Sequence, residues 1–273
     1  MNLMCKTLEV TRGGYYDWRK RPASLRQERR TKLVERIRQV HDGSRRTYGS
    51  PRITVELKQS GMPVCRNSVA KYMRQDGICV KPRRKFVPRT TDSDHEHPIA
   101  PNLLDRDFAA TAPNQKWACD LTYIFTEEGW LYLSVVIDLF SRKVVGWSMS
   151  DGLKAAGVAE AVAMALKRRR PDGSELLHHS DRGVQYACDL YRSLLEEHEI
   201  TVSMSRPGNC YDNAVVESFF GTLKSELVHR QRYKTRDQAK DSIFEWIEVF
   251  YNRQRRHSSL GYLSPEAFEA QIN

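Results

Sequence analysis

The sequence predicts an α/β fold in which a mixed sheet is flanked by helices and preceded by a small all-α region. Charge is distributed unevenly: residues 1–91 hold 23 Lys and Arg against 7 Asp and Glu, whereas residues 113–273 hold 20 against 22. Residues 1–80 carry helical patterns, and segments of β-rich composition begin only after residue 113. These changes predict a helical region at 1–80, a basic, proline-containing linker at 81–112, and a larger domain at 113–273.

The overall composition argues against several classes of protein. The chain has 273 residues, 40% of them hydrophobic, and a mean hydropathy of −0.62, which fits a soluble protein with a sizeable core. No apolar run approaches the roughly 18 residues of a membrane span, and the start MNLMCKTLEV lacks the pattern of a signal peptide. Six scattered cysteines without a C-x-x-C pair predict reduced thiols in a cytoplasmic protein.

The first part of the chain predicts a series of short helices that ends in a helix-turn-helix. Residues 3–20 predict two short helices, and residues 24–42 predict a longer charged helix. Within 48–78, Ser50 can cap a helix that has Pro51 at its first position, and a Gly-Met-Pro break follows. A second helix then begins, with Asn67 or Ser68 as its predicted cap.

A helix, a tight turn and a basic second helix are typical of a DNA reader. Three-helix cores also serve as protein-binding modules, and the surrounding positive charge favours DNA. We therefore expect double-stranded DNA as the partner, with an affinity that falls steeply with salt. The clusters 167–170 and 253–256 are further candidates for phosphate contacts. The main predicted DNA contacts are Arg66, Lys71 and Arg74 in the helix and Arg83, Arg84 and Lys85 in the linker.

The larger domain predicts three consecutive strands followed by alternating helices and strands. A turn at 127–129 joins the first two strands as a hairpin. This order predicts a mixed sheet with helices on its faces and matches the ribonuclease-H-like architecture. The predicted strands are 117–125, 130–140, 143–150, 175–181 and 201–205, and the predicted helices are 155–170, 188–200 and 213–227.

Three carboxylates occupy positions where chemistry is plausible. Asp120 lies within an apolar strand, where a charge is costly without a partner. Asp181 directly follows the fourth strand, and Glu217 lies on the last helix, 35 residues further on. Asp181 could be an ordinary turn residue and Glu217 a solvated acid. If the three converge, hard divalent cations would relieve their repulsion, and two metals suit an in-line phosphoryl displacement.

Lys224 follows Glu217 by seven residues on the same predicted helix. At about 100° per residue the two side chains align within about 20°, and two turns separate them by about 10 Å, too far for a direct salt bridge. Gly221 lies between them and leaves room for a DNA backbone. The line of residues therefore favours an acid for metal and a lysine for phosphate.

Three other polar residues near these acids invite a functional interpretation. Alternation along the fourth strand puts His179 on the same face as Asp181, and we expect it to support the site or to contact DNA. Asp138, within the second strand, is a further buried acid outside the triad. Asp212 is expected to cap the helix that carries Glu217.

Three segments carry a resemblance to a known family: WACDLTYI (117–124), HHSDRGVQY (178–186) and NAVVESFFGTLKSEL (213–227). They resemble the signature blocks of DDE transposases related to retroviral integrase. The chain is most similar to the second-reading-frame (OrfB-type) transposases of the insertion-sequence-three family. The resemblance covers nearly the whole chain, including the tail at 251–268, and three blocks in this order are a specific match.

The resemblance implies a function and a set of roles. Asp120, Asp181 and Glu217 would be the catalytic triad and would bind two Mg²⁺ or Mn²⁺ ions. The enzyme would cleave DNA at the ends of an insertion sequence and join the 3′-hydroxyl to target DNA without a covalent protein–DNA intermediate. Lys224 matches a position thought to contact the terminal DNA of the element.

The resemblance also implies partners and one difference. We expect a homo-oligomer on DNA, a possible upstream-frame protein or fusion partner, no membrane association, and a cytoplasmic, nucleoid-associated location. Retroviral integrases carry an N-terminal zinc site, whereas His41, Cys65 and Cys79 lack its spacing, so we expect no zinc.

Two alternatives to a transposase stay open at the level of sequence. One is a non-catalytic DNA-binding regulator that occupies the ends of the element. The other is a ribonuclease-H-type nuclease, which shares the fold and the metals. The intact set of three acids favours an enzyme over the regulator.

Overall fold

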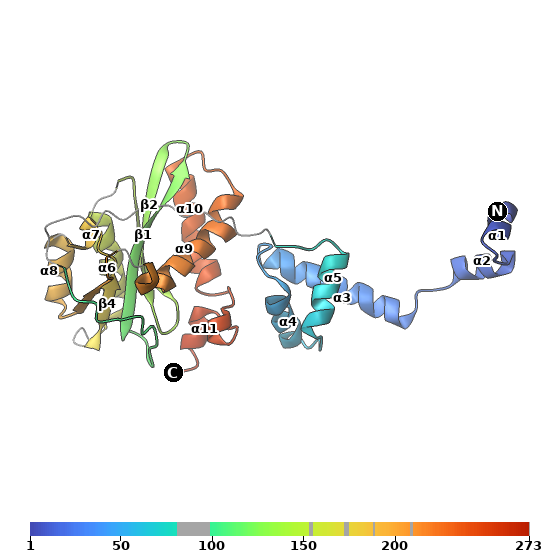
Figure 1. Ribbon diagram of the computed structural model, residues 1–273, viewed down its shortest axis with the longest axis horizontal. Helices are drawn as coiled ribbons and strands as arrows, with labels where there is room; N and C mark the ends of the chain where they lie inside the picture. Colours follow the sequence, from blue (N-terminus) through green and yellow to red (C-terminus); the bar gives the residue numbers. More distant parts are fainter. Residues whose placement is uncertain (81–98, 153–154, 172–174, 188, 208–209, 273) are drawn as a thin grey trace. The chain divides into compact units, whose positions relative to one another are not determined.

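The computed structural model describes residues 1–80, 99–152, 155–171, 175–187, 189–207 and 210–272 (Figure 1). The chain divides into two compact units, Met1–Lys81 and Pro82–Asn273, which we call the N-terminal and C-terminal units. No helix in the described ranges is both long enough and apolar enough to cross a membrane.

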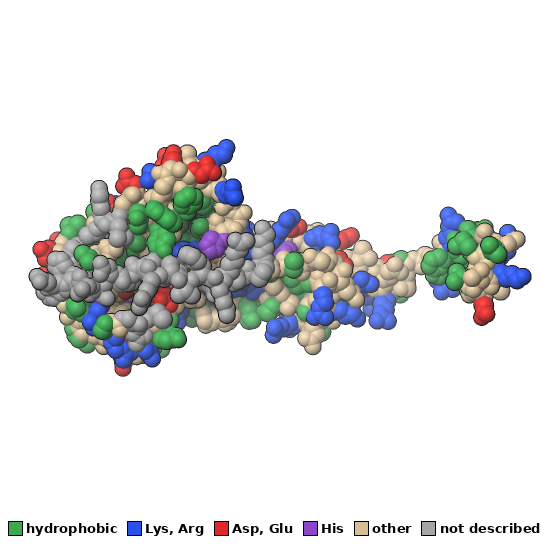
Figure 2. All heavy atoms as spheres, turned by 45° about the horizontal axis from the view of Figure 1, so that its top comes forward, with side chains coloured by type: hydrophobic (Ala, Val, Ile, Leu, Met, Phe, Trp, Pro, Cys, Tyr) green, Lys and Arg blue, Asp and Glu red, His purple; other side chains and the backbone are tan. Residues whose placement is uncertain are grey.

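The N-terminal unit is helical, as the sequence predicts. Its core forms where α3, α4 and α5 meet, and the buried side chains include Ile37, Ile53 and Val69. Many Lys and Arg side chains lie on the visible face of this unit (Figure 2). The helices are α1 (Asn2–Thr7), α2 (Arg12–Lys20), α3 (Leu25–Gly43), α4 (Ser50–Gln59) and α5 (Arg66–Gln75).

The predicted caps of α4 and α5 are wrong by one to three residues. The N-cap of α4 is Gly49, and Pro51 lies in the first turn, where its missing N–H costs nothing. The N-cap of α5 is Cys65, and its side chain makes no capping hydrogen bond to the helix. The helix-turn-helix itself is present, with the turn between α4 and α5.

The C-terminal unit is built on one five-stranded sheet with the order β3-β2-β1-β4-β5. The first three strands are antiparallel, and β4 and β5 run parallel to β1. This is the mixed, ribonuclease-H-like sheet that the order of elements predicts. The strands are β1 (Lys116–Thr126), β2 (Gly129–Asp138), β3 (Val144–Ser150), β4 (Leu177–Ser180) and β5 (Thr201–Met204).

Helices cover both faces of this sheet (Figure 1). On one face, α6 (Ala155–Arg169), α7 (Val184–Ala187) and α8 (Asp189–Glu197) enclose a core with Trp117 and Cys119 of β1. On the other face lie α9 (Ala214–Glu226) and α10 (Arg236–Glu245), which contact β1 and β2 respectively. A π-helix (Trp246–Tyr251), α11 (Pro265–Glu269) and the short 3₁₀ turns Cys210–Asn213, Val228–Arg230 and Ser258–Leu260 complete the described elements.

The segment after α10 packs on α9 and holds it through a buried ion pair and an aromatic contact. Arg255 is 5% exposed and donates from Nε and Nη2 to both carboxylate oxygens of Glu226, at 2.8 and 2.7 Å. The Tyr251 ring meets Phe219 of α9 edge-to-face at 4.8 Å. Removing one partner of a buried ion pair leaves the other charge uncompensated and destabilises the fold. The tail and α9 therefore depend on each other for stability.

The two basic clusters of this unit are largely engaged in ion pairs within the protein. Arg168 donates to Glu248 at 2.7 Å, and Arg169 pairs with Glu269. The predicted DNA contact is wrong for the buried Arg255. Lys167, Arg168 and Arg170 remain exposed, so the prediction of phosphate contacts stays open for the first cluster.

The predicted linker divides into two parts. Its first part, with Arg83, Arg84 and Lys85, lies outside the described residues. From residue 99 the chain packs on the C-terminal unit: Leu104 is 2% exposed, and the backbone N–H groups of Leu103 and Leu104 donate to Ser203 Oγ.

Gly146 marks the closest contact between the sheet and α6. A Cβ atom at this position would lie 2.0 Å from the carbonyl oxygen of Ala161 and 2.8 Å from the backbone nitrogen of Ala165. Only glycine therefore allows β3 to approach the helix backbone this closely.

We expect Gly146→Ala to destabilise the C-terminal unit by about 2 kcal/mol or more, because the clash is with backbone atoms that cannot rotate away. Urea unfolding of the full chain, followed by tryptophan fluorescence, measures the loss. Gly157→Ala in α6 is the matched control, since its Cβ would meet the flexible Ser150 hydroxyl at 3.3 Å. Equal stabilities of the two variants would contradict this account of the helix–sheet contact.

The buried His178 of β4 should make the free energy of unfolding depend on pH. Its side chain is fully buried against Tyr191, and burial lowers its pKa from 6.5 to about 3. Between pH 6.5 and about 3 the unfolded chain therefore binds a proton that the folded chain does not, so stability falls as pH falls. At pH 5 the loss from this residue is about 2 kcal/mol.

His178→Phe should remove this contribution. The change in the free energy of unfolding between pH 7 and pH 5 should shrink by about 2 kcal/mol relative to the wild type. Comparing each protein with itself at the two pH values cancels any packing cost of the substitution. Identical pH dependences would show that His178 is protonated in the folded protein.

Candidate active site

Asp120 and Asp181 reach the same place through the register of two parallel strands. β1 and β4 pair at Lys116↔Leu177, Trp117↔His178 and Ala118↔His179, and β4 ends at Ser180. Asp120 and Asp181 each stand two residues beyond the last pair. Because side chains alternate along a strand, both carboxylates project from the same face at the same edge.

Helix α9 brings Glu217 to this edge. The helix buries Val216, Phe219, Phe220 and Leu223, as its apolar stripe predicts, and leaves Glu217 exposed beside them. At its start, Asn213 Nδ2 donates to the carbonyl oxygen of Cys119 at 3.1 Å. This hydrogen bond ties the beginning of α9 to the residue that precedes Asp120.

The three carboxylates affect one another electrostatically. Burial raises the pKa of Asp120 well above its ordinary value, and the negative charges of Asp181 and, more weakly, Glu217 raise it further. The Leu121 N–H donates to Asp120 Oδ1 at 2.7 Å and opposes this shift. Partial desolvation beside the apolar stripe of α9 also raises the pKa of Glu217, although its side chain stays accessible to solvent. The edge therefore concentrates negative charge that its own hydrogen bonds compensate only in part.

A divalent cation fits this donor set. In the described part of the chain, no three His, Cys, Asp or Glu side chains are close enough to hold a metal ion together. The site nevertheless offers carboxylate oxygens, which Mg²⁺ and Mn²⁺ prefer, and burial together with the charge of Asp181 raises the pKa of Asp120, a repulsion that a cation would relieve.

Lys224 lies beside Asp120. Its Nζ is 5.2 Å from the centroid of the Tyr123 ring. Burial lowers the pKa of Lys224, whereas the charge of Asp120 raises it. Lys224 and Glu217 do not pair with each other among the ion pairs of the described residues, as their helical spacing predicts.

Asp212 has a different role from the predicted one. It is fully buried and accepts hydrogen bonds from Asn102, Arg106 and Arg206, and the Arg206 guanidinium holds its pKa well below the ordinary value. The N-cap of α9 is Asn213, which makes no side-chain capping bond. The predicted cap is therefore wrong, and Asp212 instead joins the segment after the linker to the loop before α9.

His179 and Asp138 also belong to the framework. His179 is fully buried between Ser203 Oγ, at 2.9 Å from Nδ1, and Ser205 Oγ, at 3.1 Å from Nε2, and burial lowers its pKa to about 4. Of the two expectations for His179, its burial fits a supporting role and does not fit a DNA contact. Asp138 is opposite Trp117 in the register of β1 and β2, near the start of β1. Its carboxylate accepts hydrogen bonds from the backbone N–H groups of Asn114 and Phe140.

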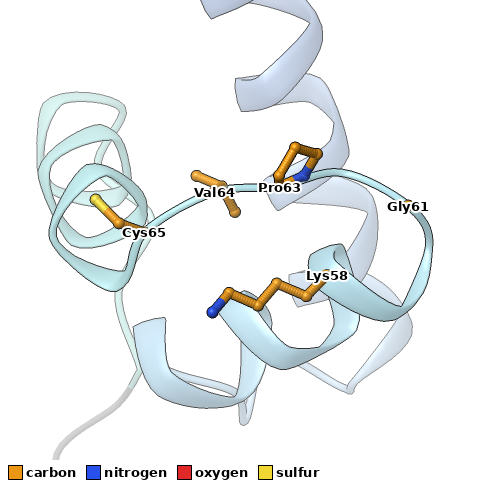
Figure 3. Close-up of a pocket in the computed structure, with 5 residues that line it drawn as sticks. All are labelled: Lys58, Gly61, Pro63, Val64 and Cys65. Carbon is orange, nitrogen blue, oxygen red and sulfur yellow. The ribbon is translucent and has the colours of Figure 1, made fainter.

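The predicted DNA contacts of the N-terminal unit lie together on α5. Arg66, Lys71 and Arg74 are exposed, and the last two line a shallow hollow on the outer face of the helix. A second hollow of about 550 Å³ lies at the turn between α4 and α5, and the Lys58 side chain extends across it toward Cys65 (Figure 3). Sequence reasoning missed Lys58, although it stands in the last turn of α4, just before the Gly-Met-Pro break.

Comparison with families and solved structures gives consistent matches. Residues 110–210 and 198–265 match families described as Integrase core domain, and residues 26–86 match the HTH-like domain. A simian T-cell lymphotropic virus intasome in complex with PP2A regulatory subunit B56 gamma aligns over 85% of this chain and 74% of that one, at 14% identity and a TM-score of 0.49. The catalytic core of BIV integrase aligns over 58% and 95%, at 21% identity and a TM-score of 0.44. Both scores are below 0.5, so the fold assignment rests on strand order and family match.

Two relatives match almost from end to end. The "Insertion element IS600 uncharacterized 31 kDa protein" of Shigella sonnei is 45% identical over 97% of both chains. "Transposase InsF for insertion sequence IS3A" of Escherichia coli (strain K12) is 45% identical over 97% of this chain and 92% of that protein. With this identity, and with an HTH-like domain followed by an integrase core, the chain belongs to the IS3 family of transposases.

Proposed function

We propose that Asp120, Asp181 and Glu217 are the catalytic triad of this transposase, and that it cleaves DNA at the ends of an insertion sequence and transfers the freed strand to target DNA. The observation that carries the proposal is the register of β1 and β4, which brings Asp120 and Asp181 to one edge and one face. The hydrogen bond from Asn213 to Cys119 supports the placement of Glu217 at the same edge.

The three acids would hold two Mg²⁺ or Mn²⁺ ions. When bound, these ions supply the positive charge that stabilises the attacking and departing oxygens of an in-line phosphoryl displacement. Burial raises the pKa of Asp120, and the charges of Asp181 and, more weakly, Glu217 raise it further, so a cation held by these acids would relieve their repulsion.

The remaining groups orient the DNA. Lys224 lies two turns after Glu217 and carries its positive charge to the same edge as Asp120. Lys224 is suited to bind the phosphate next to the reacting one. This contact would hold the reacting phosphodiester in line, first for attack by water and then for attack by a 3′-hydroxyl. No residue needs to form a covalent bond with DNA in this scheme.

The N-terminal unit would supply the affinity for double-stranded DNA. Arg66, Lys71 and Arg74 on α5, together with Lys58 at the turn, form its exposed basic surface. A helix that presents such residues enters the major groove in helix-turn-helix proteins. Because an insertion sequence has two ends, we also propose that the enzyme acts as a homo-oligomer on DNA, alone or with an upstream-frame partner.

The triad is tested by removing charge without changing shape. Asp120→Asn, Asp181→Asn and Glu217→Gln should each lower Mg²⁺-dependent strand cleavage and strand transfer by about 1,000-fold or more, because metal stabilisation of the transition state is worth several kcal/mol. Denaturing gels of a labelled oligonucleotide that carries the element end resolve cleaved and joined products.

Asp189→Asn is the matched control for Asp181→Asn, because Asp189 is an exposed acid at the start of α8. It should retain wild-type activity. Unchanged cleavage by Asp181→Asn would overturn the catalytic assignment. Cleavage without joined products would indicate a nuclease instead of a transposase.

The DNA-binding assignment predicts a change in salt dependence. Lys71→Ala and Arg74→Ala should each weaken binding to duplex DNA and reduce the slope of log affinity against log salt by about 1, because each loses one phosphate contact. Fluorescence anisotropy at several salt concentrations measures the slope. Lys240→Ala is a control, since Lys240 pairs with Asp237 in the C-terminal unit; equal slopes in all three variants would contradict the assignment.

A further inference from the structure

The β1–β2 hairpin carries an exposed aromatic surface. Phe125 and Trp130 are directly paired across the hairpin, as are Tyr123 and Tyr132, so all four rings lie on one face. Phe125 is 63% exposed and Trp130 is 45% exposed. Their rings nevertheless pack edge-to-face, with the ring centroids 5.4 Å apart. Tyr123 also meets Trp130 edge-to-face, at 4.9 Å.

The fold explains why this face is open. Nearer the core, the same face of the hairpin continues as Cys119 and Val136, which are fully buried under α6. Gly157, near the start of α6, lies close to Ser134. The last pair between β2 and β3 is Tyr132↔Ser150, and from there to its turn the β1–β2 hairpin projects past the rest of the sheet (Figure 1). Hydrophobic side chains are exposed in this region of the unit (Figure 2).

The opposite face of the hairpin behaves differently. Ile124, Leu131 and Leu133 are at most 1% exposed there, and α10 contacts β2. The hairpin is therefore well packed on this face, and the exposure of Phe125 and Trp130 is specific to the other face. Leaving such large apolar rings in water is unfavourable, and covering them with a ligand would be favourable.

Lys224 links the aromatic surface to the proposed catalytic residues. Tyr123 and Phe125 are three and five residues from Asp120, so at about 3.3 Å per residue they lie about 10 and 17 Å further along β1, with side chains on its other face. Lys224 connects the two regions, because its ammonium lies over the Tyr123 ring and interacts with Asp120. A DNA strand with a phosphate at Lys224 would therefore pass beside Tyr123, at the edge of the aromatic surface.

We propose that Phe125 and Trp130 form a stacking site for an unpaired nucleobase of the strand held in the active site. This inference rests on the proposed function of Asp120, Asp181 and Glu217. An edge-to-face contact occupies the edge of one ring and one face of the other, so open faces remain for a base. Stacking of bases on aromatic side chains requires no particular sequence, because every base has a π-face.

The dimensions favour a base over a second protein. A large aromatic side chain buries 150–250 Å², so the free parts of Phe125 and Trp130 offer on the order of 200 Å². A stable protein interface needs about 800 Å² on each side. The hairpin tip adds Glu127 and Glu128 and no further apolar surface. The free area is therefore too small for a second copy of the chain.

The test uses full-length protein in a Glu217→Gln background, so that DNA is bound and not cleaved. The probes are a short single-stranded oligonucleotide containing 2-aminopurine and a blunt duplex of the same length. Phe125→Ala and Trp130→Ala should each weaken binding of the single strand by roughly 5- to 150-fold. They should also remove the quenching of 2-aminopurine, and duplex affinity should change less than 3-fold.

Two control variants separate stacking from folding. Phe125→Tyr keeps an aromatic ring and should retain both affinity and quenching. Phe244→Ala removes another exposed aromatic, 48% exposed and packed on Trp147, and should bind the single strand like the parent protein. Near-UV circular dichroism of each variant verifies that the hairpin and core remain folded.

The proposal is overturned if Phe125→Ala and Trp130→Ala bind and quench the single strand as Phe244→Ala does. A change of oligomeric state in light scattering with unchanged quenching would also overturn it and would indicate a protein interface. The proposed function fails separately: cleavage by the Glu217→Gln protein would refute the triad, whereas these binding measurements would still report stacking.

Discussion

The early end of the pairing between β1 and β4 is the constraint on which the rest of the site depends. The two strands share only three pairs, and β1 then continues for eight residues beyond Ala118 without β4 beside it. One edge of β1 is thereby open where Asp120 stands. Asn213 hydrogen-bonds to β1 at this open edge, and Lys224 reaches the ring of Tyr123. A longer β4 would pair with the backbone that these groups approach.

The acids of the C-terminal unit fall into two groups that burial alone does not distinguish. Asp212 and Glu226 each accept hydrogen bonds from an arginine guanidinium group. The hydrogen bonds and charges of the arginines around Asp212 lower its pKa. Asp120 has other carboxylates as its main charged neighbours, and its pKa rises. Perturbation in this direction is typical of functional sites. The first group holds segments together, whereas the second accumulates a charge that a cation can neutralise.

The sequence was sufficient for most elements of the fold because their periodicity is strong. The apolar stripe of α9 and the strand predicted at 117–125 both appear in the structure. The caps were wrong at α4, α5 and α9 because several adjacent polar residues can cap a helix, and tertiary contacts select among them. Asp212 illustrates this, since its partner Arg106 is 106 residues away and leaves no local signal.

The candidate site was only partly accessible to sequence reasoning. The cost of a charge within an apolar strand singled out Asp120, and its place at a strand end singled out Asp181. Their common edge depends on the register of β1 and β4, which spacing does not specify. The resemblance to DDE transposases supplied the grouping with Glu217. Clusters of arginine were misleading for a related reason: the sequence does not reveal that Arg255 meets Glu226 in the core. The exposed aromatic pair of the hairpin depends on where α6 begins, which is a property of packing.

The ion pair between Arg255 and Glu226 has a consequence for damaged copies of a mobile element. A frameshift or stop codon shortly before position 255 would spare all three acids and every strand. Its product would lack Arg255, which donates two hydrogen bonds to Glu226 on the helix that carries Glu217. The last stretch of the chain therefore helps to hold α9 in place, and a shortened product would lose this contact.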